Sequence, residues 1–102
     1  MSFSSANEII TAVRVEVTEE ELTVGLADGR TVSAPLSWYP RLVHATPEER
    51  SQWQLVGGGF GIHWPGVDED LSVASLLAGR PSGERQESLQ RWLVRRQVLV
   101  LG

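Results

Sequence analysis

His63, Asp68 and Asp70 are the residues whose types and spacing best suit metal chemistry. One imidazole and two carboxylates can bind a divalent cation, and Glu69 could supply a further oxygen ligand. A short acidic run before an apolar segment is also typical of a loop leading into a helix, where the helix dipole stabilises the negative charge without a metal. The second interpretation is favoured, because acidic clusters of this length are weak motifs. The three residues are therefore candidate metal ligands, while no cofactor is predicted.

Other catalytic arrangements lack the residues that they need. The sequence has no cysteine and no lysine, which excludes thiolate nucleophiles, cysteine–zinc sites and lysine Schiff bases. The glycine run at 57–61 has no following Lys-Ser/Thr and opens no long helix, so it predicts a hairpin turn rather than a phosphate-binding loop. His44 has no serine or cysteine partner with the support of a motif. The sequence thus predicts a protein that is not an enzyme.

Aromatic and arginine side chains indicate surfaces for a protein partner. These residue types are enriched at the centres of protein interfaces, and four tryptophans are many for a core of this size. Trp53 and Trp64 fit the core, whereas Trp38 fits core and surface equally well. The predicted partner-binding residues are Trp38, Tyr39 and Arg41 in one group, and Leu89, Trp92 and Leu93 in the other.

The second group lies on a C-terminal helix predicted from Glu84 to about Gln97. Glutamates near its start and arginines near its end complement the helix dipole. Its apolar stripe, with the apolar tail at 98–102, is expected to pack on the same domain or on a partner subunit. Alternatively Arg91, Arg95 and Arg96 could contact nucleic-acid phosphates, although a net acidic chain counts against this. Residues 1–79 are assigned to a small domain and residues 80–102 to this C-terminal segment.

The elements that must position these residues begin with a three-stranded meander over residues 10–35. Alternating valines and leucines predict half-buried strands. A three-residue loop at 27–29 with Gly29 left-handed pairs Val24 with Val32 and Leu22 with Ala34. A two-residue loop would instead place Val32 on the wrong face, so the register favours the longer loop.

Beyond the meander, the sequence predicts short helices and a second hairpin. Residues 37–43 predict a short helix, and a capping box at Thr46 and Glu49 starts another. A second hairpin follows, with a return strand over 60–64 that places Phe60, Ile62 and Trp64 on one side. Ser72 caps a helix over 73–78, which Gly79 ends. The predicted fold class is α+β: a meander, a second hairpin, two short helices and a C-terminal amphipathic helix.

Composition narrows the class of protein further. The 102 residues are 41% hydrophobic and carry nine arginines against thirteen acids, a net charge of −4, which fits one acidic domain. The N-terminus lacks the pattern of a signal peptide, and no stretch reaches the roughly 20 apolar residues of a membrane span. We therefore expect a cytoplasmic protein without membrane contact.

Four motifs in order resemble the bacterial and phage family known as domain of unknown function 2442. They are Asp28-Gly29-Arg30, residues 35–42, residues 45–50, and Gly61 to Trp64 continuing through 68–73. The resemblance covers about residues 9–79 and implies a small α+β fold. It also implies an antitoxin-like role, since some relatives stand beside a small toxin-like partner, whereas others are fused to a helix-turn-helix domain. We expect no such domain in residues 80–102, because one helix is too short for two helices and a turn, and the family implies no catalytic residues.

Together these features predict a non-enzymatic protein-interaction or regulatory module, antitoxin-like in type. It would bind a protein partner or self-associate through its C-terminal helix. The alternatives are a metal-dependent enzyme using His63, Asp68 and Asp70, and nucleic-acid binding through the arginines of the C-terminal helix.

Overall fold

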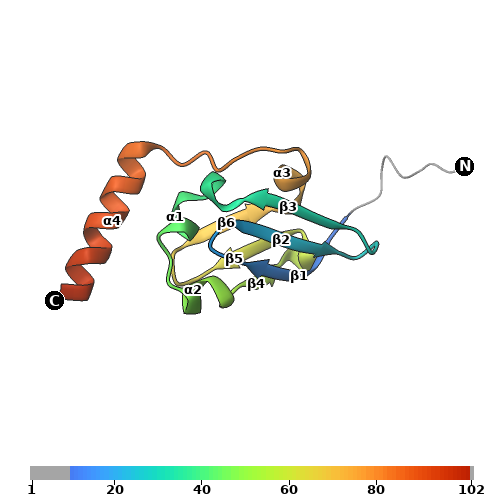
Figure 1. Ribbon diagram of the computed structural model, residues 1–102, viewed down its shortest axis with the longest axis horizontal. Coiled ribbons are helices and arrows are strands. Elements are labelled where there is room, and N and C mark those ends of the chain that lie inside the picture. The colour runs from blue at the N-terminus through green and yellow to red at the C-terminus, as the bar shows by residue number, and fades with distance from the viewer. Residues whose placement is uncertain (1–9, 102) are drawn as a thin grey trace, which may run out of the picture.

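The computed structural model describes residues 10–101, and the side chains up to residue 97. Two three-stranded antiparallel sheets and several short helices form the body, and a longer helix lies at one end (Figure 1). This arrangement confirms the predicted α+β class. Within residues 10–101, no helix combines the length and apolar character needed to cross a membrane.

The first sheet is the predicted meander, with strands in the order β1 (Ala12–Val17), β2 (Glu21–Leu26) and β3 (Thr31–Pro35). Leu22 pairs with Ala34 and Val24 with Val32, as the register argument requires. The turn closes through a hydrogen bond from the Leu26 amide to the Arg30 carbonyl, and Gly29 adopts a φ of +94°. The prediction of a three-residue loop is thereby confirmed.

Val13 departs from the predicted alternation. The pairing of β1 with β2 shifts between Ala12 and Arg14, so that two steps along β1 oppose one step along β2. This bulge buries Ala12 and turns Val13 outward to 55% exposure, while Val15 remains in the core. A period-two pattern cannot reveal such an insertion, because the apolar residues still alternate in the sequence.

The second sheet contains β4 (Gln54–Val56), β5 (Gly61–Trp64) and β6 (Glu69–Ser72) in that order. The acidic segment, expected to be a loop, is thus largely a strand, because Glu69 and Leu71 face the core while Asp70 and Ser72 face outward. Phe60, expected beside Ile62 and Trp64, precedes β5 in the turn and is 49% exposed. These two expectations are corrected.

The helices occupy the ends and edges of the body. They are η2 (Leu36–Trp38), α1 (Pro40–Val43), α2 (Pro47–Ser51), η3 (Gly57–Gly59), α3 (Val73–Leu77) and α4 (Gln86–Leu101). The capping box of α2 is present: Thr46 accepts from the Glu49 amide at 3.1 Å, and Glu49 accepts from the Thr46 amide at 2.9 Å. Ser72 caps α3 by accepting from the amide of Ser75 at 3.0 Å.

One core lies between the two sheets and continues under the short helices. Leu22 and Val24 from the first sheet and Ile62 and Trp64 from the second have no exposed surface. Trp38 and Trp53 are partly buried against this core. The core therefore determines how both sheets present their outer faces.

Helix α4 extends further than predicted, since its backbone remains helical to Leu101 where an apolar tail was expected. The packing expected for the side chains of 98–102 lies outside the described residues. The helix follows a connector without regular structure at 80–85 and lies at the end of the body formed by α1 and α2 (Figure 1).

Candidate functional site

The candidate metal ligands lie together on the outer side of the second sheet. His63 and Asp70 are cross-strand partners on β5 and β6, and the imidazole Nδ1 lies 2.7 Å from an Asp70 carboxylate oxygen. Asp68 occupies the turn between these strands with a left-handed backbone (φ 53°), which aspartate tolerates better than most residues. Donor atoms of the three residues lie within 4.8 Å of one another.

This arrangement is open to solvent rather than enclosed. The side chain of His63 is 27% exposed and that of Asp70 is 73% exposed. An ion about 2.1 Å from each donor needs donors at most about 4.2 Å apart, so small side-chain rotations would suffice. The residue types suit zinc or manganese. The cluster therefore remains a candidate for a weak metal site.

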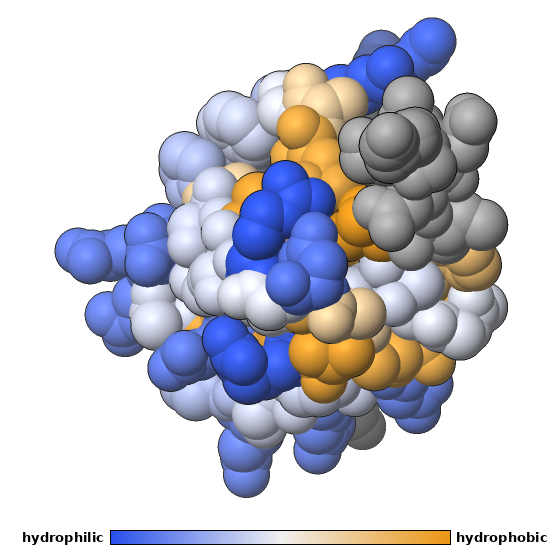
Figure 2. Space-filling model, turned by 90° about the vertical axis from the view of Figure 1, so that its right-hand side faces the viewer, coloured by the Kyte–Doolittle hydropathy of each residue, from blue (hydrophilic) through white to orange (hydrophobic). Residues whose placement is uncertain are grey.

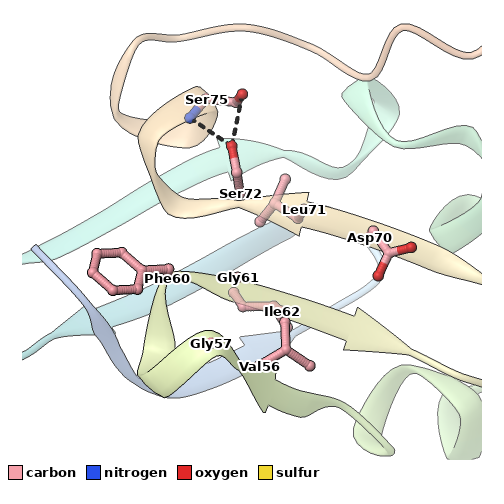
Figure 3. Close-up of a pocket in the computed structure, with 9 residues that line it drawn as sticks. All are labelled: Val56, Gly57, Phe60, Gly61, Ile62, Asp70, Leu71, Ser72 and Ser75. Atoms are coloured by element: carbon pink, nitrogen blue, oxygen red, sulfur yellow. Dashed lines mark hydrogen bonds between the residues drawn. The ribbon is translucent and has the colours of Figure 1, made fainter.

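A shallow groove of about 580 Å³ runs along the same sheet beside this cluster (Figure 3). Asp70 belongs to both features, because it lines one end of the groove. Val56 and Phe60 supply apolar surface, and Ser72 and Ser75 lie opposite, linked by a hydrogen bond between their hydroxyls at 2.8 Å. The groove thus combines an apolar side with a polar one.

The groove borders an edge of the sheet that is unusually apolar for a surface. All of β4 is exposed, and Leu55, Val56 and Phe60 are 38%, 41% and 49% exposed. β4 pairs with β5 on one side and, within the described part of the chain, with no strand on the other. Hydrophobic surface is also visible on the end of the molecule that faces away from α4 (Figure 2).

The tight turn η3 positions this edge against the first sheet. Its three glycines all have positive φ, and a Cβ atom on Gly59 would lie 2.7 Å from the carbonyl oxygen of Ala12. Only glycine permits both the backbone conformation and this close approach. The glycine run is therefore a structural turn, as its sequence context predicts.

Arg41 is the centre of a second set of interactions, at the other end of the body. Its guanidinium donates to both carboxylate oxygens of Glu84, at 2.7 and 2.9 Å, and to the carbonyls of Val67 and Asp68. The Arg41 and Glu84 side chains are only 12% and 8% exposed. The hydrogen bonds from Arg41 are the main reason that the pKa of Glu84 is lowered.

Trp92 anchors α4 beside this pair. It is 8% exposed, and the guanidinium groups of Arg41 and Arg96 lie over its ring at 5.0 and 5.2 Å from the centroid. Arg96 also forms an ion pair with Glu49, whose pKa is lowered chiefly by these hydrogen bonds. Stacking of arginine on an indole and paired charges therefore hold α4 to α1 and α2.

Glu69 and Tyr39 are two polar side chains buried close to this interface. Glu69 is 8% exposed, and burial, reinforced by the charge of Glu84, raises its pKa to about 7. Tyr39 is 1% exposed, and its hydroxyl has no hydrogen-bond partner among the described residues. Burial, with a contribution from Glu69, also raises the pKa of Tyr39.

Comparison with known proteins places this architecture in a family. A family model described as a protein of unknown function (DUF2442) matches residues 12–82, more than half of the chain. The chain belongs to the DUF2442 family. The predicted resemblance is thereby confirmed, and α4 begins beyond the matched DUF2442 region.

Solved structures show the same fold for the DUF2442 region. A crystal structure of a protein of unknown function from Rhodospirillum rubrum is 25% identical, with a TM-score of 0.65 over 76% of this chain and 95% of that chain. The solution structure of an uncharacterized protein from Chromobacterium violaceum is also 25% identical, with a TM-score of 0.61 over 72% of this chain and 69% of that chain. No curated protein matches the chain.

Most of the residues predicted to bind a partner pack within the chain itself. Tyr39 is inside the DUF2442 core rather than on the surface where the prediction placed it. Arg41 and Trp92, predicted on separate surfaces, are in contact. Trp38, Leu89 and Leu93 are partly buried against the core. The apolar stripe of α4 is therefore directed at the body of its own chain.

The three arginines predicted to contact nucleic acid differ in their surroundings. Arg91 and Arg95 are exposed on α4, whereas Arg96 is engaged with Glu49 and Trp92. Glu49 and Glu84 were not predicted as partners of Arg96 and Arg41, because no local signal links residues so far apart in the sequence. The burial of Glu69 was not predicted either, although the alternation of Glu69 and Leu71 with Asp70 and Ser72 could have revealed it.

Proposed function

We propose that the chain is a non-enzymatic protein-interaction module with a regulatory, antitoxin-like role. The observation that carries the proposal is the exposed edge of β4, where Leu55 and Val56 stand beside Phe60 and the groove. An edge strand with exposed apolar side chains is a template on which another chain can add a strand. The partner would pair with the β4 backbone and place apolar side chains in the groove.

The family match and the structural relatives name neither a reaction nor a partner. Both structural relatives are described only as proteins of unknown function or uncharacterized. An antitoxin-like regulator needs a surface that binds one protein tightly, and β4 with its groove provides apolar area next to the hydrogen-bonding groups of Ser72 and Ser75. The predicted cytoplasmic location remains part of this proposal.

Site-specific photo-crosslinking in the native cell tests the surface. A photoreactive amino acid at position 60 is expected to capture one protein, whereas the same amino acid at Val13 should not. Val13 is a suitable control because it is also apolar and 55% exposed, but lies on β1 of the other sheet. Capture of the same proteins from both positions, or of none, would contradict the proposed surface.

The regulatory role is tested on the captured protein itself. Expression of that protein alone should arrest growth, and co-expression of the chain should relieve the arrest. A Phe60→Glu variant should fail to relieve it, while Val13→Glu should succeed. Growth that is unaffected by the captured protein would exclude the antitoxin-like role while leaving the interaction surface intact.

A metal-dependent activity is the second candidate, favoured by the donor atoms of His63, Asp68 and Asp70 within 4.8 Å. Calorimetric titration with zinc and with manganese tests it directly. If these residues bind the ion, the wild-type chain should show a heat of binding, and the Asp68→Asn and His63→Gln variants should not. Equal heats in wild type and variants would remove this candidate.

A further inference from the structure

We infer that residues 1–9 fold back over the groove of the second sheet and cover it until a binding partner displaces them. These residues precede the described part of the structure, which begins at Ile10. The inference rests on the function proposed above for the partner alone, because covering of the groove needs no second protein. It is carried by the place where the chain enters β1, by the shape of the groove and by the sequence of the segment.

The chain enters β1 directly beside one end of the groove. A Cβ atom on Gly59 would lie 3.0 Å from the side chain of Thr11, so the two segments are in contact there. Phe60, the next residue, lies at this end of the groove, and Asp70 lies at the opposite end (Figure 3). Ile10 is packed against the core, so the described chain is held in place up to the point where the segment begins.

The centre of the groove is low because it is formed by a glycine. Ile62 points into the core, so Gly61 lies on the outer side of β5 and contributes no side chain to it. Gly61 pairs with Val56 on one neighbouring strand and with Ser72 on the other. An apolar side chain seated over Gly61 would therefore contact Val56, which is 41% exposed, and shield it from water.

The segment is long enough to cover the groove. Packed sheets lie about 10 Å apart, and three extended residues span about that distance, so residues 7–9 suffice to pass from β1 around Phe60. From Phe60 to His63, the partner of Asp70, β5 advances by about 10 Å. Residues 1–6 span up to about 20 Å when extended, which exceeds the length of the groove.

The sequence of the segment suits this surface. Met1 and Phe3 alternate with serines, so an extended backbone presents both large apolar side chains on one face. Glu8 is the one charged side chain in residues 1–9, and it belongs to the part that passes around the edge of the sheet. Among the described residues that line the groove, only Asp70 is charged. Contact between the two surfaces therefore meets little electrostatic repulsion.

Covalent attachment favours this segment over a free chain of the same composition. A tethered segment is present at its site at an effective concentration in about the millimolar range. A contact with a dissociation constant of about 1 mM therefore keeps the groove covered for roughly half of the time, and burial of two large apolar side chains is of this order. A partner that buries more surface displaces the segment.

Nuclear Overhauser contacts in the full chain test the covering directly. Ring protons of Phe3 are expected to show contacts with the methyl groups of Val56, and the Val56 resonances should move in Phe3→Ser. They should stay in place in Ser4→Ala, which is a matched control because it changes the same segment on the opposite side of an extended backbone. Equal Val56 resonances in wild type and Phe3→Ser would overturn the inference.

A mixture of isotope-labelled and unlabelled chains shows which copy provides the segment. Contacts within one chain are expected, because the segment is tethered next to its own groove. Contacts between Val56 of a labelled chain and Phe3 of an unlabelled chain would place the segment on a second copy and overturn the inference.

Capture of the partner in the native cell tests the displacement. A photoreactive amino acid at Leu55, which is exposed on β4 but does not line the groove, leaves Val56 and Phe60 unchanged. If the segment covers the groove half of the time, Phe3→Ser should raise capture at this position about twofold, whereas Ser4→Ala should not. Equal capture in the three chains would overturn the displacement.

The two measurements also separate this inference from the function proposed above. Contacts of Phe3 with Val56 in a chain that captures no protein at position 55 would support the covered groove and contradict the β4 interaction surface. Capture without those contacts would support the interaction surface and overturn the inference.

Discussion

The guanidinium carbon of Arg41 lies 5.0 Å from the centre of the Trp92 ring, and the same guanidinium donates two hydrogen bonds to Glu84. One arginine on the four-residue helix α1 thus contacts both the start of the C-terminal segment and the middle of α4. Because Trp92 covers Arg41, the ion pair is shielded from water and is stronger than an exposed pair.

Trp92→Ala should release α4 while leaving the body folded. Removal of a buried tryptophan side chain costs roughly 3 kcal/mol or more. This loss should lower the free energy of the local opening of α4 rather than that of global unfolding, because the two sheets form most of the core. Hydrogen exchange at 86–97 measures this opening. Val94→Ala, at a position 58% exposed, should change the opening free energy by less than about 0.5 kcal/mol.

Arg41 and Glu84 should show strong energetic coupling in a double-mutant cycle. Charged hydrogen bonds between side chains only 12% and 8% exposed should contribute about 2 kcal/mol. The matched control is the pair of Arg30 with Asp28, also at 2.7 Å but 61% and 36% exposed, whose coupling should stay below about 1 kcal/mol. Equal coupling in the two cycles would mean that shielding by α4 has no energetic effect.

Glu69 should make stability fall as pH rises from 5 to 8. Its pKa is about 7 in the folded chain against 4.5 as its ordinary value, so the folded state binds the proton more tightly. Its stabilising contribution is therefore complete below about pH 4.5 and is lost as the pH rises through 7, at about 1.4 kcal/mol for each unit of pKa difference. Glu69→Gln should flatten this dependence in urea unfolding at pH 5 and pH 8. Glu16→Gln, at an exposed position on β1, should preserve it.

Gly59→Ala should destabilise the fold more than Gly29→Ala. Both glycines have φ near +95°, so alanine costs about 1 kcal/mol of backbone strain at either position. At Gly29 nothing lies within 4 Å of the added methyl, whereas at Gly59 it would meet the Ala12 carbonyl at 2.7 Å. Thermal unfolding should show the larger loss for Gly59→Ala. Equal losses would indicate that η3 can move away from β1 without cost.

Local sequence patterns predicted some features of the fold and missed others. The register of the meander, the left-handed Gly29 and the capping box at Thr46 all depend on residues close together in sequence, and all are present. The bulge at Val13 and the strand β6 were missed. Both depend on hydrogen bonds to a neighbouring strand, and those bonds override the local pattern of polarity.

For the candidate sites, the sequence by itself determined which chemistry is available: one histidine near two aspartates, no cysteine or lysine, and aromatic residues with arginines at two places in the chain. Only the tertiary structure decided that Arg41 meets Trp92, that Glu69 is buried, and that β4 remains an exposed edge. The physical reason is that ion pairs, desolvation and edge exposure depend on which distant segments pack together. That packing is set by the shared core of the two sheets rather than by the residues of any one motif.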